Sequence, residues 1–396
     1  MSNIRVTLAI HWEGRHLDGV KHFAQDRKRL IPGIPVTHFV SAAYFARGGD
    51  IEEIVKAMLP AFESNDEIAL HVPAWQSIRG ARHEPSRSVI VGDDPELVVE
   101  YPGITAQPDR GYTYPISAYE KPSIESFIVT SKLLLRPLLQ AVVLRRGLNI
   151  ERVLRGIRAG HGMASDVFLV AACNSGFKYD ASGMDAVWAR DSADRAEAEA
   201  KRGEQLFAPL WRHWADLWGS TEQNEPHLSN HGMRAGTGGA GINASTQPFF
   251  IARAGGSQLL ELPVNGGVVP PASPQHVAEL LTNALESPPG VPRIVSIALR
   301  QETAEHSLDA LMAVEALHSQ RIRWTTNVDL LEALLGKPAI AEPEPQRPFQ
   351  VIREQMAKHL PINVPLAQHG APPQAPAGPV APPVVIPSIQ VPQIKT

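Results

Sequence analysis

Polar side chains follow the end of a short apolar run at several places in the sequence. Three of these side chains are the carboxylate of Glu13, the imidazole of His71 and the guanidinium of Arg158. A carboxylate and an imidazole can hold a cation or move a proton, and a guanidinium can hold an anionic group. If the runs are parallel strands, their carboxyl ends meet at one mouth of the fold, so we expect a shared pocket there. The runs are Ile4–Arg15, Ile68–His71, Gly156–Arg158 and Val295–Glu302.

Segments of helical periodicity separate these apolar runs and indicate an α/β fold. Runs that are apolar at most positions are typical of strands buried on both faces, as in parallel sheets and barrels. Strand–helix alternation predicts parallel βα units, and a single α/β barrel of about 250 residues or more fits within this chain. The expected strands are Ile4–Arg15, Val36–Ala43, Glu67–His71, Arg155–Ala159, Ser257–Val264, Arg293–Leu299 and Ile322–Thr325.

The expected helices alternate with those strands. Asp50 is predicted to cap the helix at Ile51–Glu63, and Asn327 is predicted to cap the last one. Pro137 is expected to kink or divide a long helix, and Gly176 is expected to end a short one. The helices are predicted at Leu17–Leu30, Ile51–Glu63, Ser123–Arg146, 166–174, His276–Leu285, Ser307–Leu317 and 327–335.

The domain organisation follows from changes in composition. Residues 1–335 are predicted to form one barrel-like domain. Residues 80–122, rich in Gly, Pro, Asp and Arg, are expected to form an irregular insertion that serves as a lid or a pocket wall. Residues 336–396, rich in Pro and Ala, have the composition of a largely disordered tail. Such a tail can bind a protein partner through an aromatic groove or can have no partner at all.

Charge and cysteine content exclude several classes of function. A formal net charge of -4 over 396 residues gives no basic surface for nucleic acid. The single cysteine, Cys173, excludes an intrachain disulfide and a thiolate cluster, and its apolar surroundings favour a buried residue over a nucleophile. We expect no secretory signal and no apolar run of about 18 residues, hence no membrane contact and a cytoplasmic location.

Five stretches of the sequence carry a family resemblance in their order. They read LAIHWEG, NDEIALHVPAW, IRAGHGMASDVFLVAACNSGFKYDAS, LLELPVNGG and IVSIALRQET. Together they resemble the polysaccharide deacetylase family, the chitooligosaccharide-deacetylase homology domain of carbohydrate esterases, over about residues 4–335. The resemblance implies a distorted (β/α) barrel in which a divalent metal, held by one carboxylate and two histidines, helps water to cleave an N-acetyl or related amide. It also implies a second carboxylate as base, held by an arginine, and a late histidine as acid.

Carried over by position, the resemblance is incomplete. Of the family's adjacent acid pair only Glu13 remains, so Glu13 and Arg158, which matches the family arginine, are the predicted catalytic residues. His71 matches one metal ligand, but the positions where a second histidine could follow hold Pro73 and Trp75.

The later motifs also depart from the family pattern. Arg300 stands where the acidic histidine is expected, and His161 follows the arginine motif where no histidine is usual. No role is assigned to His161.

A metal site can still be assembled, because catalytic zinc takes three protein ligands and a water. His11 lies two residues before Glu13, on the same face of a regular strand, and could be the third ligand. The predicted metal ligands are thus His11, Glu13 and His71, a set suited to zinc first, and to cobalt, manganese or iron.

Trp12, Trp75 and Arg300 are the predicted substrate contacts. Each has a structural alternative. The tryptophans can be core residues, Arg300 can bridge to Glu302, and Arg158 can form a buried ion pair with Glu13 that shapes an empty pocket.

Two functions remain open at this point. The first is a metal-dependent hydrolase that removes an acyl group from an N-acetylated carbohydrate or a small amide. The second is a catalytically silent relative that binds carbohydrate or acts as a scaffold, which the missing ligands and the guanidinium of Arg300 favour.

Overall fold

A computed structural model of the chain describes residues 4–12, 17–46, 50–72, 116, 121–162, 164, 166–183, 247–252, 258–267, 274–286, 293–301 and 304–336. Most of the predicted insertion at 80–122 and all but the first residue of the predicted tail at 336–396 lie outside these ranges.

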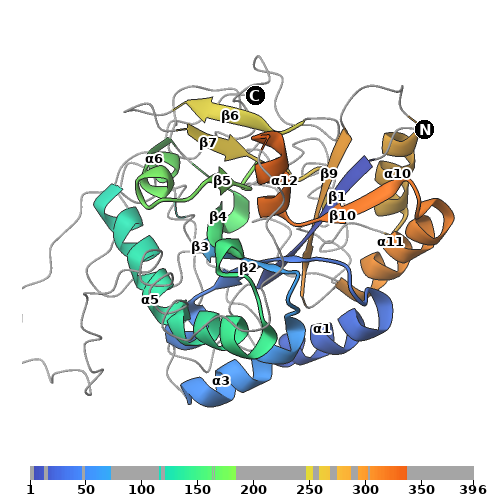
Figure 1. The fold of residues 1–396 in the computed structure, drawn as a ribbon. Helices are drawn as coiled ribbons and strands as arrows, with labels where there is room; N and C mark the ends of the chain where they lie inside the picture. The colour runs from blue at the N-terminus through green and yellow to red at the C-terminus, as the bar shows by residue number, and fades with distance from the viewer. Residues whose placement is uncertain are drawn as a thin grey trace, which may run out of the picture. The chain divides into compact units, whose positions relative to one another are not determined.

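One sheet of ten strands forms the centre of the described fold (Figure 1). Its order is β6-β7-β5-β4-β3-β2-β1-β9-β8, and β10 pairs with β1 beside this path. All pairs are parallel except β6 with β7. The strands are β1 (Ile4–Trp12), β2 (Thr37–Ser41), β3 (Glu67–Val72), β4 (Val153–Ala159), β5 (Tyr179–Asp180), β6 (Phe249–Ala252), β7 (Gln258–Glu261), β8 (Gly266–Gly267), β9 (Arg293–Arg300) and β10 (Ile322–Thr325).

The sheet is curled, and the chain connects its two ends without a strand pair between them. β8 follows β7 after a few residues and pairs with β9, so the strand path that leaves β7 through β5 returns to it. Side chains reinforce this closure: the amide of Asn265 accepts from the backbone N–H of Ser296 at 2.9 Å, and Gln247, just before β6, accepts from the N–H of Ile294 at 3.0 Å. The predicted distorted (β/α) barrel is confirmed.

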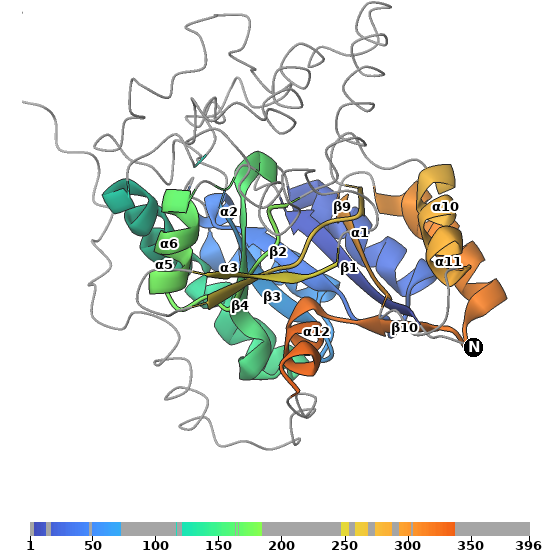
Figure 2. The ribbon, with the colours of Figure 1, turned by 90° about the horizontal axis from the view of Figure 1, so that it is seen from above.

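Helices surround this sheet (Figures 1 and 2). The side chain of Asp50 accepts from the N–H of Glu52 at 2.8 Å, so the predicted cap is confirmed, whereas the last helix is capped by Thr326 and not by Asn327. Gly176 ends α6 with φ at 86°. The helices are α1 (Leu17–Leu30), α2 (Ala43–Ala46), α3 (Ile51–Met58), η1 (Leu59–Ala61), α5 (Lys121–Arg146), η5 (Ile150–Arg152), η6 (Gly160–Gly162), α6 (Asp166–Asn174), α10 (Pro274–Leu285), α11 (Ala304–His318) and α12 (Asn327–Leu334).

The helix α5 is the longest helix described, with 26 residues. It continues through Pro137 and contains an 18-residue window with a mean hydropathy of 1.6, which by length and composition alone could cross a membrane. However, 56% of that window is buried inside the structure, with Leu135, Leu138 and Leu139 fully buried. This burial is typical of a core helix. The sequence prediction that no segment would be long and apolar enough was wrong.

The pairing of β3 with β4 contains an irregularity that matters for the site. Ile68 pairs with Val153, but Leu70 pairs with Ile157, so β4 carries two extra residues between these pairs. Leu154, within this bulge, has φ of 52°, a conformation that costs a non-glycine residue about 1–2 kcal/mol. The bulge brings Arg158 opposite His71.

Candidate functional site

Polar side chains gather at the carboxyl ends of the parallel strands. His71 on β3 pairs in register with Arg158 on β4, and Asp180 on β5 pairs with Glu261 on β7. On the other side of β2, His11 on β1 pairs in register with Arg300 on β9. The strand ends that the sequence singled out therefore do lie along one edge of the sheet.

The two imidazoles of the predicted metal set lie side by side across β2. The ring centroids of His11 and His71 are 5.4 Å apart, and the ring of Phe39 lies 5.3 Å from that of His11. Both histidines are buried. Two imidazoles on one zinc ion, each bound at about 2.1 Å, have ring centroids roughly 5 Å apart, so the spacing fits two ligands of one cation.

The third predicted ligand, Glu13, lies outside the described residues, as does Trp75. Within the part of the chain that the structure describes, no group of three His, Cys, Asp or Glu side chains is arranged to hold a metal ion. The metal set therefore stays a prediction. Of His161 the structure describes the backbone, in η6, but not the side chain.

Arg158 lies beside two acids that the sequence analysis did not single out. Its guanidinium Nη1 donates to the backbone carbonyl of Ala181, next to Asp180. Arg158, Asp180 and Glu261 are all buried. The predicted ion pair of Arg158 with Glu13 is not tested, but Arg158 does have acidic neighbours.

Burial raises the pKa of both acids. The pKa of Asp180 is raised because desolvation outweighs the hydrogen bonds it accepts and the positive charge of Arg158. The pKa of Glu261 is raised well above its ordinary value by desolvation and then by the negative charge of Asp180. Buried carboxyls with raised pKa values at strand ends are typical of functional sites.

Both acids carried a signal in the sequence. Glu261 follows the apolar pair Leu259 and Leu260, as Glu13 follows an apolar run in the sequence, and Asp180 follows Tyr179. Both also lie within stretches that carry the family resemblance. The strands they end are only four and two residues long, too short for apolar periodicity to mark them.

Arg300 lies where a substrate contact would be expected. It is half-buried at the end of β9, next to His11 in register. The following residue, Gln301, donates from its backbone to the carbonyl of His11 and from its side chain to the hydroxyl of Tyr44 at 2.6 Å. The predicted role of Arg300 is consistent with this position and stays a prediction.

Trp12 does not lie in the pocket. Strand residues alternate between faces, so Trp12 points away from His11, into the layer between the sheet and the helices. It is fully buried, stacks on Phe62 at 5.5 Å and packs edge-on against Phe23. Its indole donates to Nδ1 of His38 at 3.1 Å. The predicted substrate contact is corrected: Trp12 is a core residue.

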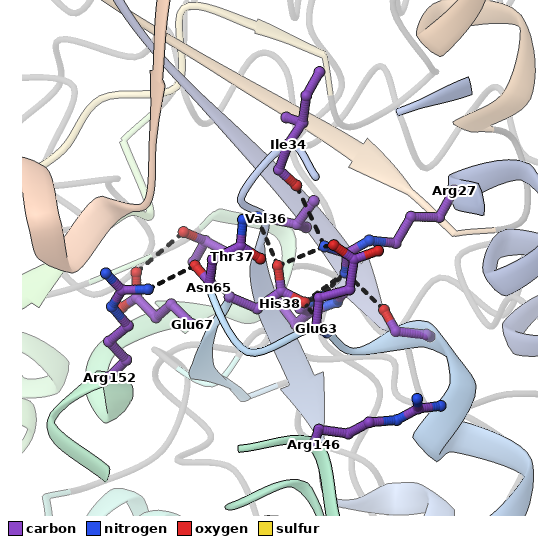
Figure 3. A network of polar contacts seen from close by, with 12 residues as sticks. Arg27, Ile34, Val36, Thr37, His38, Glu63, Asn65, Glu67, Arg146 and Arg152 are labelled. Carbon is purple, nitrogen blue, oxygen red and sulfur yellow. Dashed lines mark hydrogen bonds and ion pairs between the residues drawn. The ribbon is translucent and has the colours of Figure 1, made fainter. Parts of the chain in front are cut away.

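His38, on β2, belongs to a buried network around Asp66 (Figure 3). Arg27 binds both oxygens of Asp66, at 2.5 and 2.7 Å. Backbone N–H groups of Val36 and Glu63 also donate to Asp66, at 3.0 and 2.7 Å. Because Trp12 occupies Nδ1 of His38, its Nε2 carries the proton and donates to Asp66 at 3.1 Å.

The ionisation of this network follows from its partners. The charge of Arg27 and the hydrogen bond from His38 lower the pKa of Asp66 although burial raises it. Desolvation lowers the pKa of His38, so its imidazole is neutral, as the bond from Trp12 requires. The network connects α1 to the residues just before β2 and β3. It has the character of a structural core.

A second buried acid, Glu67, lies at the amino end of β3, opposite the candidate site. It accepts from the hydroxyl of Tyr179 at 2.5 Å, from Thr37 at 3.1 Å and from the N–H of Val328 at 2.8 Å, at the start of α12. Burial raises its pKa to about 7. Gly156 makes room for Tyr179, since a Cβ there would lie 1.8 Å from the tyrosine ring.

Comparisons with known proteins give structural likenesses only. No protein-family model matches the chain, and no curated protein is significantly similar to it in sequence. A structure from Mycobacterium smegmatis described as a polysaccharide deacetylase is similar at a TM-score of 0.44 and 11% identity, covering 87% of this chain and 96% of that one.

Two further solved structures are similar to a comparable extent. The allantoinase PuuE matches with a TM-score of 0.41 and 12% identity, covering 86% of this chain and 93% of its own. A structure from Pseudomonas aeruginosa PAO1 described as a polysaccharide deacetylase matches with a TM-score of 0.40 and 11% identity, over 86% and 93% of the two chains. Because these TM-scores are low, the fold is assigned from the strand order and not from the similar structures.

Proposed function

We propose that the protein is a metal-dependent amide hydrolase of the deacetylase type, which removes an N-acetyl or related acyl group from a carbohydrate or a small amide. The observation that carries the proposal is the pair of buried imidazoles, His11 and His71, with centroids 5.4 Å apart at the strand ends beside Arg158. A cytoplasmic location, and a protein partner for the proline-rich tail, are proposed on the sequence alone.

In this proposal His11 and His71 hold the cation together with Glu13, which follows His11 by two residues. Zinc is the first choice, with cobalt, manganese and iron as alternatives. A divalent cation at such a site lowers the pKa of a water and polarises an amide carbonyl. Arg158 would orient a carboxylate that accepts the proton of the water, and Arg300 would bind the substrate near His11.

Elemental analysis of protein purified without chelator tests the metal site. We expect about one divalent ion per chain in the wild type, and loss of it in His71→Ala and in Glu13→Ala, because catalytic zinc sites usually need three protein ligands. His22→Ala, an exposed histidine on α1, is the matched control and should keep the ion. Hydrolysis of N-acetylated sugars and small amides would then be compared in the same four proteins.

A second candidate function is a catalytically silent barrel that binds carbohydrate or acts as a scaffold. The position of Arg300 favours it, because a guanidinium next to His11 in register disfavours a cation at the same place. Wild-type protein that contains no metal and takes up no Zn, Co or Mn would support this function over the hydrolase.

A further inference from the structure

Asp180 and Glu261 are neighbours in register on two parallel strands, β5 and β7. Adjacent strands lie about 4.8 Å apart, so side chains at paired positions are in contact. Both carboxyls are completely buried, and the charge of Asp180 raises the pKa of Glu261. Two neighbouring carboxyls in a desolvated place do not both ionise, because their like charges repel strongly there.

The other hydrogen bonds show which acid holds that proton. Both oxygens of Asp180 accept from Ser182: one from its backbone N–H at 3.0 Å, the other from its hydroxyl at 2.7 Å. An oxygen that accepts is suited to the ionised form. Glu261 accepts at Oε1 from the N–H of Gly183 at 2.8 Å, whereas its buried Oε2 accepts no hydrogen bond from the described residues, so Glu261 is the acid better suited to the neutral form.

The charge balance leads to the same assignment. Arg158 is the cation whose field reaches both acids. Two ionised carboxylates beside one guanidinium would leave a net negative charge in a buried place, which is costly. One proton on the pair leaves a single negative charge against the single positive charge of Arg158.

The same residues tie the end of β4 to the segment after β5. Arg158 donates to the carbonyl of Ala181, and the N–H of Ala159 donates to the hydroxyl of Ser182 at 2.9 Å. Ser182 is in turn held by Asp180, and the N–H of Gly183 is held by Glu261. The acid pair thus fixes the backbone to which the guanidinium is bound.

We propose that Asp180 and Glu261 share one proton, with Glu261 as the neutral partner, and act together as positioning residues that hold Arg158 opposite His71. The proton sharing stands independently of the function proposed above. The consequence for turnover rests on that proposed function.

Infrared spectroscopy tests the shared proton directly, through the carbonyl stretch of a protonated carboxyl. At about pH 8.5, above the pKa of about 7 of Glu67, we expect such a band in the wild type and its loss in Glu261→Gln. Glu67→Gln is the matched control: it should remove only a band that already disappears between about pH 6 and 8.5. A wild-type spectrum without the band at about pH 8.5, or a band that Glu261→Gln leaves in place, would overturn the proposal.

The positioning role has its own measurement. Glu261→Gln keeps a neutral side chain of the same shape, and we expect kcat for amide hydrolysis to stay within about threefold of wild type. Asp180→Asn removes the negative charge that holds Arg158, and we expect kcat to fall about 100-fold, with KM and metal content unchanged. Equal losses in both variants would overturn the positioning role. If the wild type binds no metal and hydrolyses nothing, the proposed function fails, while the infrared band still decides the shared proton.

Discussion

Two buried clusters in this protein each surround one arginine, and they differ in the number of fully buried acids. In the network around His38, Arg27 faces one fully buried carboxylate, Asp66, which accepts from five donor atoms. Its second acidic partner, Glu63, lies 3.3 Å away and is 34% exposed. At the strand ends, Arg158 faces two carboxyls, Asp180 and Glu261. Desolvation is the largest influence in both places, yet the pKa of Asp66 is lowered while those of the other two are raised.

The comparison shows that charge stoichiometry decides what a buried acid does. One carboxylate matched by one guanidinium and enough donors stays ionised and stabilises the fold. Where the buried acids outnumber the guanidinium by one, one acid keeps its proton. The charge of that acid can change, as functional sites require. Four predictions test the buried charged groups, and the first has the largest expected effect.

Removing the charge of Asp66 should have the largest effect on stability. Asp66→Asn leaves the buried Arg27 with only the partly exposed Glu63 as a counter-charge, which we expect to lower the free energy of unfolding by about 3–5 kcal/mol in urea titrations. The control is Asp26→Asn, which breaks a surface pair with Arg29 and should cost about 0–0.5 kcal/mol. A similar small loss in both variants would contradict the structural role of the network.

The two acids at the strand ends should respond unequally to neutralisation. Asp180→Asn removes the ionised partner of Arg158, and we expect a loss of about 2–3 kcal/mol in the free energy of unfolding. Glu261→Gln replaces a neutral acid with a neutral amide and should cost about 1 kcal/mol or less. If Glu261→Gln proves the more costly change in urea titrations, the proton has been assigned to the wrong acid.

The neutral imidazole of His38 should make the fold sensitive to mild acid. Its pKa is lowered in the folded state from 6.5, so the unfolded chain binds a proton first as the pH falls. Stability is therefore fully present above pH 6.5 and decreases below it, by at most about 1.4 kcal/mol per pH unit. Urea titrations between about pH 7.5 and 5 should show this slope, and it should be reduced in His38→Gln but not in His22→Gln.

Glu67 should act in the opposite direction. Its pKa is raised from 4.5 to about 7, so between these values the folded state holds the proton more tightly than the unfolded chain. Its contribution is present below pH 4.5 and is lost as the pH rises through about 7. Glu67→Gln should therefore steepen the acid sensitivity caused by His38, and a shallower slope in this variant would contradict the assignment.

Much of the fold could be predicted from the sequence because its signals are local. The strands through Glu67–His71 and the cap at Asp50 depend on apolar runs and on one side chain bonding to its own helix. β6 was missed, and Asn327 was chosen as a cap in place of Thr326, whose hydroxyl accepts from the N–H of Asp329. Asparagine and threonine are both common N-cap residues, so the sequence does not distinguish Asn327 from Thr326. The backbone conformation does.

The candidate site could be predicted only in part, because its residues become neighbours through the pairing register of strands that are far apart in the sequence. Strand ends predicted that His71 and Arg158 would be neighbours, and they are. The face on which Trp12 lies depends on the alternation of β1, which places His11 and Trp12 on opposite sides. Asp180 and Glu261 become a pair only through the neighbouring positions of β5 and β7, 81 positions apart in sequence numbering (261 minus 180).

The bulge in β4 has a consequence for anyone who would redesign this barrel. Had β4 continued its ladder from Val153 without extra residues, Gly156 would stand level with His71, and the guanidinium would sit two positions, roughly 6–7 Å, farther along. Regularising the strand and relieving Leu154 would add ladder bonds while pulling the arginine out of reach of its neighbours. A more regular scaffold would thus suit this chemistry less well, since the bulge is what places the guanidinium of Arg158 opposite His71.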